Sequence, residues 1–234
     1  MLSASQARSS AKNGFTLVEL LVVITIVVVL AALIFAVGVR ARDTAQNAQC
    51  VSSLRRLAIA GQSYAATHGS YPNQGRQPDG GSAFWFKAME EELGFEPGTN
   101  AAVIERAETM PTCKKCLNTH GPGTNPNNRF IRTYSMNHGL LNPTQNSEGQ
   151  FTFPGLRAIR VKYPSRTAFF MDGTLAQDGP YWHYLARRGE WLNPKNFIHG
   201  DKANVVFIDG HVEAFRLGEV PTDGDNPFWN PLAD

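Results

Sequence analysis

The dominant hydrophobic pattern of the chain is an apolar stretch from Leu20 to Val39 that contains no charged residue. A bilayer core of about 30 Å is crossed by roughly 20 apolar residues in a helix. The stretch therefore predicts a membrane-spanning helix, to which we assign residues 15–39. One carboxylate, Glu19, lies at its leading edge. A charged group inside a membrane is costly, so such a residue usually has a partner or a function.

Beyond Val39 the pattern changes from uniformly apolar to amphipathic. His68-Gly69 followed by Pro72 is typical of a helix end. We therefore expect one helix from Phe15 to His68, about 80 Å long at 1.5 Å per residue, with residues 40–68 packing on a domain. The face predicted to pack recurs at steps of three and four residues and comprises Ala41, Ala45, Ala48, Val51, Leu54, Leu57, Ala58, Gly61, Tyr64 and Ala65.

Residues 69–234 are rich in glycine and proline and predict a small α+β head built on an antiparallel sheet. Ala83 to Leu93 suits a short helix. The aromatic run within it, Phe84-Trp85-Phe86, belongs either to the core or to an exposed interaction patch. The last residues, from Pro221 to Asp234, form a polar tail whose Phe228 and Trp229 would dock on the domain or on a neighbour.

The strands of the head are expected mainly in its second half. One strand is predicted near Phe130–Met136. Ala203 to Ile208 is rich in Val, Ile and Phe, and the chain returns with alternation from Val212 to Leu217. Asp209-Gly210 between them is a strong two-residue turn signal, so residues 203–217 predict a hairpin.

Charge and cysteine content limit the kinds of function that the chain could have. The 234 residues carry a net charge of +2, close to neutral, with acidic and basic residues interspersed, which argues against nucleic-acid binding, where a strongly basic face is expected. The chain has three cysteines. In an oxidising compartment, one disulfide and one free thiol is the simplest arrangement. Cys50, on the long helix, fits the role of a small apolar residue.

Cys113-Lys114-Lys115-Cys116 leaves several interpretations open. A small disulfide or a free pair in a loop is the simplest. A zinc site would need two more ligands, for which His120 and His138 are available. A redox pair would need a thioredoxin-like pattern that the sequence does not show. Haem attachment would need histidine directly after the second cysteine, where Leu117 stands.

Lys12-Asn13-Gly14-Phe15-Thr16-Leu17-Val18-Glu19-Leu20 resembles the class III signal of type IV pilins and type II secretion pseudopilins. The resemblance implies a leader, residues 1–14, that prepilin peptidase removes between Gly14 and Phe15. Phe15 would then be N-methylated, and Glu19 would meet the free amine of a neighbouring subunit during assembly. An ordinary signal peptide would instead need a small-residue cleavage site near Ala31-Ala32 or Ala36, and a plain membrane anchor leaves the Gly14–Glu19 pattern unexplained.

The orientation in the membrane is ambiguous from charge alone, because Arg8 and Lys12 precede the span and Arg40 and Arg42 follow it. The resemblance implies a cytoplasmic N-terminus. It places the protein in a bacterial inner membrane as a single-pass protein with a periplasmic head, or in an extracellular fibre after assembly.

The C-terminal half carries a second motif: His199, nine residues, then Asp209-Gly210. It resembles the motif of a bacterial subfamily of these proteins, and Tyr134–Asn137 and Thr167–Gly173 are similar to segments that precede it there. From the residues themselves we expect a hydrogen-bonded His199–Asp209 pair that holds the hairpin.

A calcium ion held by Asp201, Asp209 and loop carbonyls is the alternative, since a pseudopilin subgroup binds calcium in its C-terminal loop. Calcium takes six or more oxygens, however, and few acids are present here. Catalysis by His199 and Asp209 is not favoured, because no nucleophile stands in a recognisable motif.

Together these patterns predict a structural prepilin-like subunit rather than an enzyme, with no cofactor. It would join a type IV pilus or a type II secretion pseudopilus, with prepilin peptidase, other pilin or pseudopilin subunits and the inner membrane as partners. The competing hypothesis is a membrane-tethered periplasmic or extracellular binding module that does not polymerise, with its binding loops between Tyr71 and Gly149.

Overall fold

A computed structural model describes residues 16–76, 82–83, 85–94, 134–145, 151–175, 182–183 and 185–234. The sequence predictions made for Gly14, Phe15, Phe84, Cys113, Cys116 and His120 lie outside these residues. The chain divides into two units, Met1–Arg42 and Asp43–Asp234.

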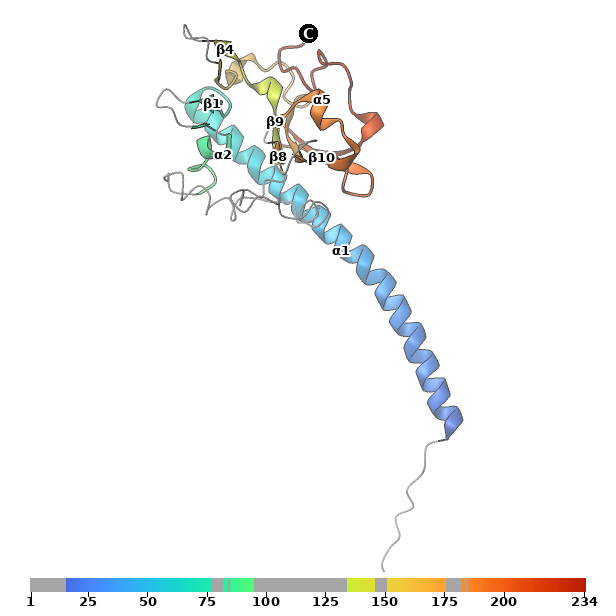
Figure 1. Ribbon diagram of the computed structural model, residues 1–234. Coiled ribbons are helices and arrows are strands. Elements are labelled where there is room, and N and C mark those ends of the chain that lie inside the picture. Colours follow the sequence, from blue (N-terminus) through green and yellow to red (C-terminus); the bar gives the residue numbers. More distant parts are fainter. Residues whose placement is uncertain are drawn as a thin grey trace, which may run out of the picture. The chain divides into compact units, whose positions relative to one another are not determined.

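Helix α1, Leu17–His68, is the longest element (Figure 1). Its 52 residues correspond to about 78 Å at 1.5 Å per residue. It ends at the predicted residue: the Gly69 N–H donates to the Ala65 carbonyl at 2.9 Å, and Gly69 has φ 72°. A left-handed glycine directly after the last turn is a common helix terminator, because it satisfies carbonyls that the helix leaves unpaired.

In the first unit α1 presents apolar side chains to its surroundings. Its large apolar residues from Leu17 to Phe35 are each about half exposed or more. By length and composition, α1 is the one helix among the described residues that could cross a membrane. Thr25, a polar residue within this stretch, donates its hydroxyl to the Leu21 carbonyl at 2.7 Å, which satisfies the hydroxyl inside the helix.

In the second unit one face of α1 is buried against the head, as Figure 1 shows for its C-terminal part. The predicted face is confirmed from Val51 onward but is wrong for Ala41, Ala45 and Ala48, which are exposed. Alanine has the highest helix propensity whether or not it is buried, so its spacing does not distinguish a packed face from an exposed one. The buried residues are Cys50, Ser53, Leu54, Leu57, Ala58, Ala60, Gly61 and Ala65.

A five-stranded sheet forms the centre of the head, in the order β11-β10-β6-β3-β9. Its strands are β11 Val212–Arg216, β10 Lys202–Phe207, β6 Ala168–Asp172, β3 Tyr134–Asn137 and β9 Leu185–Ala186. All neighbours pair antiparallel except β3 and β9. The predicted α+β layout, a long helix with a small antiparallel sheet as in pilins, is therefore confirmed.

The two faces of this sheet pack against different parts of the chain. Val206, Phe170 and Met136 are aligned across three strands and share a cluster with Leu54 and Leu57 of α1. Val205 and Met171, one position away, point to the other face and share a cluster with Phe228 and Trp229. The C-terminal tail therefore docks on its own domain.

Smaller elements complete the head. A four-stranded sheet has the order β2-β1-β5-β4, and a two-stranded sheet pairs β7 with β8. Their bounds are β1 Gln74–Arg76, β2 Ser82–Ala83, β4 Thr144–Gln145, β5 Phe151–Phe153, β7 Thr174–Leu175 and β8 Trp182–His183. The short helices are α2 Trp85–Ala88, α5 Arg188–Trp191, η1 His138–Leu140, η2 Ala158–Arg160, η3 Pro194–Asn196 and η4 Leu217–Glu219.

The predicted short helix is shorter than expected. It begins at Trp85 instead of Ala83, because Ser82 and Ala83 pair with β1, and it is α-helical only to Ala88. The core interpretation of its aromatic residues is confirmed for Trp85 and Phe86, which are 2% and 3% exposed. The predicted strand near residues 130–136 is β3, and the predicted hairpin is β10–β11.

Candidate functional site

The start of α1 forms a reciprocal hydrogen-bonded cap around Thr16 and Glu19. The Glu19 carboxylate accepts from the Thr16 N–H at 2.9 Å and from the Thr16 hydroxyl at 2.8 Å, and the Glu19 N–H donates to the same hydroxyl at 3.3 Å. This is a capping box, which satisfies backbone donors that a helix start otherwise leaves unpaired. The residue predicted to bind a neighbour's amine is therefore held in place by its own helix.

His199 of the C-terminal motif is positioned by a tight turn. Gly200 and Asp201 have φ 63° and 69°, and the His199 N–H donates to the Lys202 carbonyl at 2.9 Å. Two consecutive left-handed residues are the signature of a tight reverse turn, in which glycine and aspartate are favoured. The turn directs the imidazole inward, and the side chain is 4% exposed.

The partner of His199 is Asp172, at the end of β6. His199 Nε2 lies 3.3 Å from Asp172 Oδ2, and the aspartate side chain is fully buried. The same oxygen accepts from the Asn204 N–H of β10 at 2.6 Å. The other oxygen, Oδ1, is buried and has no hydrogen-bond partner among the residues that the structure describes.

The polar cluster extends from Asp172 to α1 and to the far side of the sheet. The Asn204 side-chain amide donates to Asn47 Oδ1 of α1 at 2.8 Å. The Trp191 indole N–H donates to the backbone carbonyl of Asp172 at 2.7 Å. The ion-pair contact of His199 and these hydrogen bonds therefore link the motif histidine, the centre of the sheet and the long helix, and Asp172 is the residue at which they meet.

The predicted His199–Asp209 pair is wrong. Asp209 Oδ1 instead lies 2.6 Å from His211 Nδ1, with both side chains more than a third exposed. His199 and Asp209 flank opposite ends of β10, so its six residues separate them by about 20 Å at 3.3 Å per residue. Sequence reasoning missed Asp172 as the partner, although the Asp-Gly that ends an apolar strand was a visible signal.

Asp209 and Gly210 do form the hairpin turn, with one residue more than predicted. The Gly210 N–H donates to the Phe207 carbonyl at 2.9 Å, and Gly210 has φ 94°. This is a longer hairpin loop that ends in a left-handed glycine. Asp209 Oδ1 also accepts from the His211 N–H at 3.1 Å, which secures the turn from within.

The structure does not bring together the two residues suggested for calcium. Asp201 and Asp209 lie at opposite ends of β10, and Asp201 accepts from Arg216 Nε at 3.0 Å. Within the described ranges, no group of three or more His, Cys, Asp or Glu side chains is placed to hold a metal ion.

Cys50 is disulfide-bonded, so its assignment as a simple apolar residue is corrected. It is fully buried on α1, and its partner lies outside the described residues. The chain has three cysteines. A Cys50 disulfide within one chain and a Cys113–Cys116 pair therefore exclude one another.

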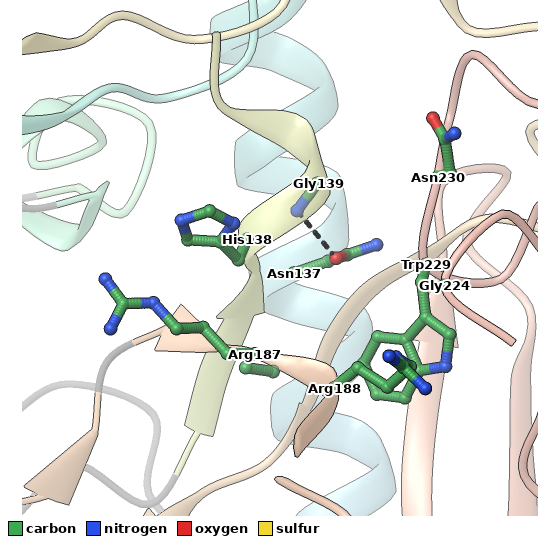
Figure 2. Close-up of a pocket in the computed structure, with 9 residues that line it drawn as sticks. Asn137, His138, Gly139, Arg187, Arg188, Gly224, Trp229 and Asn230 are labelled. Carbon is green, nitrogen blue, oxygen red and sulfur yellow. Dashed lines mark hydrogen bonds between the residues drawn. The ribbon is translucent and has the colours of Figure 1, made fainter. Parts of the chain in front are cut away.

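A pocket of about 370 Å³ opens where the parallel strands β3 and β9 end. Its lining comprises Asn137, His138, Gly139, Ala186, Arg187, Arg188, Gly224, Trp229 and Asn230. In Figure 2 the side chains of Arg187 and Arg188 point away from each other, so their guanidinium groups do not converge on one ligand. Arg187 Nη1 lies 3.6 Å from Glu190 Oε1, and the Arg188 guanidinium donates to the Thr222 carbonyl.

His138, one of the histidines considered for zinc, lines this pocket. Burial lowers the pKa of its imidazole, and the neighbouring Arg187 charge lowers it further, while Glu190 acts in the opposite direction. The neutral imidazole is therefore favoured near neutral pH. Asn137 beside it is fully engaged: its amide donates to the Ala168 and Phe228 carbonyls at 2.9 and 3.2 Å, and its oxygen accepts from Gly139 at 2.9 Å (Figure 2).

Residues 9–35 match the family described as the prokaryotic N-terminal methylation motif. Neither a curated protein nor a solved structure matches the chain. The matched residues include the end of the segment predicted to be a leader, Glu19 and most of the apolar part of α1. The match supports a type IV pilin-like precursor at this end of the chain, and the His199–Asp209 motif lies outside it.

Proposed function

We propose that this chain is a structural prepilin-like subunit. Prepilin peptidase would cut between Gly14 and Phe15 and methylate Phe15, and the mature chain would assemble through α1 into a type IV pilus or a type II secretion pseudopilus. The observation that carries the proposal is the methylation motif at residues 9–35, which leads directly into an exposed apolar helix long enough to cross a membrane.

The chemistry at the start of α1 supports this function. Cleavage after Gly14 would leave a cationic amine on Phe15, next to the Thr16 cap that now holds the Glu19 carboxylate. Both groups would then lie in apolar surroundings, where an unpaired charge is costly. Pairing of Glu19 with the amine of an adjacent copy would neutralise both charges and set the axial register between subunits.

The leader would face the cytoplasm and the head the periplasm. The second unit, 192 residues from Asp43 to Asp234, comprises the head and the C-terminal part of α1 and has its own core on both faces of the sheet. It is therefore equipped to stay folded outside the membrane while the part of α1 before Asp43 is in lipid or in a fibre.

The experiment that tests processing is intact-mass measurement with N-terminal sequencing of the protein from its native membrane. A chain that begins at N-methylated Phe15 is the expected result. A chain that begins at Met1 would contradict processing and favour a tethered binding module. Cleavage near Ala32 or Ala36 would mean a soluble secreted protein.

Assembly is tested separately with Glu19→Ala. This variant should be processed but should not enter sedimentable fibres, whereas Glu213→Ala, an exposed carboxylate on β11, should assemble as the unmodified protein does. Fibres formed normally by Glu19→Ala would contradict the role of Glu19 in assembly.

A further inference from the structure

One exposed segment of the head, residues 157–166, concentrates positive charge around apolar side chains. We call it the basic segment. It contains four cations, Arg157, Arg160, Lys162 and Arg166, and no carboxylate. Ile159 in its middle is 85% exposed, and Tyr163 is 38% exposed. An exposed apolar anchor surrounded by arginines and a tyrosine has the composition of a protein–protein interface.

The basic segment is held in shape by the rest of the head. The Ala158 N–H donates to the Gly69 carbonyl at 3.0 Å, and the Lys162 N–H donates to the Pro231 carbonyl at 3.2 Å. The Arg166 guanidinium lies 5.4 Å from the centre of the Tyr163 ring, within the range of a cation–π contact. The surface is therefore preorganised, which lowers the entropic cost of binding.

The charges of the basic segment are only partly neutralised inside the chain. Lys162 pairs with the Asp234 side chain. No ion pair to Arg157 or Arg160 is formed within the part of the chain that the structure describes. Two guanidinium groups beside an exposed isoleucine remain available to an acidic partner.

A surface of complementary chemistry lies on the same chain, at the turn that follows α2. We call Glu91-Glu92-Leu93 the acidic turn. It is held by hydrogen bonds from the Leu93 N–H to the Met89 carbonyl and from the Gly94 N–H to the Glu91 carbonyl, at 3.0 and 2.9 Å. Glu91 is exposed, and Leu93 is partly buried against the core.

Glu92 brings a second negative charge to the acidic turn. Its Oε2 atom is buried and has no hydrogen-bond partner among the described residues. Burial raises the pKa of the nearby Tyr64 hydroxyl, and the negative charge of Glu92 raises it further. The charge of Glu92 adds to that of the exposed Glu91 and favours the approach of a cation to the acidic turn.

The two surfaces lie at nearly the same level along α1. The acidic turn is beside Tyr64, and the basic segment hydrogen-bonds to Gly69. Five residues of helix correspond to about 7.5 Å. Two different, complementary surfaces on identical subunits form a contact that repeats from copy to copy, and such contacts generate open helical arrays when the rotation does not close.

We propose that the basic segment of one copy docks on the acidic turn of a second copy, with Ile159 against Leu93 and the Arg157 and Arg160 guanidinium groups facing Glu91 and Glu92. This contact rests on the proposed function, since it concerns how heads pack in the assembled fibre. In this arrangement, the basic segment and the acidic turn determine which subunit a head packs against.

The test is a charge swap in the full-length protein. Arg160→Glu alone and Glu91→Lys alone each place like charges across the contact, so each should reduce sedimentable fibre roughly tenfold. The chain that carries both substitutions regains opposite charges and should recover assembly. Glu213→Lys, the same charge change at an exposed site on β11, is the matched control and should assemble normally.

The outcomes separate the contact from the proposed function. Intact mass reports processing, and thermal melts of each purified variant report folding. If Glu19→Ala abolishes assembly but both single swaps assemble normally, the head contact is wrong while the subunit function stands. If the unmodified chain is neither processed nor assembled, the proposed function fails and the contact falls with it.

Two further results would overturn the proposal. One is a combined variant that assembles no better than the single variants although it is folded. The other is a preference of the unmodified chain for anionic over neutral phospholipid vesicles that Arg160→Glu removes while fibres persist, because it would assign the basic segment to a lipid surface.

Discussion

The buried His199–Asp172 pair makes a quantitative prediction, because the head contains an exposed pair of the same residue types for comparison. His199 and Asp172 are 4% and 0% exposed, whereas His211 and Asp209 are 43% and 37% exposed. The two pairs therefore consist of the same residue types and differ in how deeply they are buried. We predict that His199→Ala destabilises the head far more than Asp209→Ala does.

The magnitude follows from what each substitution leaves behind. His199→Ala leaves the Asp172 carboxylate buried, with the Asn204 N–H as its hydrogen-bond donor among the described residues. Breaking a buried pair by removing one partner typically costs about 3–5 kcal/mol. Asp209→Ala removes an exposed pair and one bond to the turn backbone, for which about 1 kcal/mol is expected.

The assay is urea unfolding of the full-length protein in detergent, followed by tryptophan fluorescence. Trp191 is a built-in probe, because its ring is fully buried and its N–H donates to the Asp172 backbone. Asp172→Asn and the double variant Asp172→Asn/His199→Ala complete a double-mutant cycle with His199→Ala. Since the two side chains contact each other, the double variant should lose less stability than the sum of the singles.

Either of two results would show that His199 and Asp172 do not form a stabilising pair. One is a His199→Ala protein within about 1 kcal/mol of the unmodified protein, because a buried carboxylate cannot lose its partner that cheaply. The other is additivity in the cycle, which would mean that the two side chains do not act as a pair.

Three further predictions concern the core, the pocket and the disulfide. A Cβ at Gly61 would lie 2.3 Å from the Phe169 ring, so Gly61→Ala should destabilise the head by about 1–3 kcal/mol in the same urea assay. Gly189 has open space around it, so Gly189→Ala should not destabilise the head. Folding lowers the pKa of the His138 imidazole from 6.5, so the unfolded chain binds more protons than the folded chain. The contribution of His138 to the free energy of unfolding should be fully present above pH 6.5 and lost as the pH falls through the lower pKa of the folded state. Melting curves of His138→Gln should lack this decline. Removal of the Cys50 disulfide by Cys50→Ser should cost about 2–4 kcal/mol under oxidising conditions, and unfolding curves of the two reduced proteins should nearly coincide.

The sequence predicted the long helix and the hairpin well because both depend on local signals. The end of α1 at His68 was predictable from Gly69, which adopts the left-handed conformation that terminates helices. The hairpin followed from Val, Ile and Phe enrichment on either side of Asp209-Gly210. The loop length differed by one residue, since glycine at this place closes both two-residue and longer hairpin loops.

The site was less predictable because its contacts are not local. His199 and Asp209 are close in sequence, yet an extended strand carries them apart. The partner of His199 is 27 positions earlier in the chain, on β6, and comes close only because β6 pairs with β10. Which strand neighbours which is a tertiary property, and one sequence without a structure does not specify it. Trp191 and Asn47 joined the cluster for the same reason.

Under the proposed function, the apolar part of α1 decides where the chain resides, but it does not by itself decide whether the chain assembles. Sixteen large apolar side chains between Leu17 and Val39 are 48–85% exposed. Covering half of each is worth about 15–25 kcal/mol in total, more than the whole stability of a typical domain. This free energy is gained equally in lipid and among neighbouring helices, because lipid tails are as apolar as leucine. The choice between resting in the membrane and joining a fibre therefore depends on helix packing and on the groups that lipid cannot satisfy. These groups are Glu19 at the helix start and, in our proposal, the charged surfaces of the head. Substitutions at Glu19 and at Arg160 should accordingly impair fibre formation while leaving membrane insertion unchanged. Carbonate releases from membranes those proteins that are not inserted. Release of either variant by carbonate would therefore contradict this division of roles.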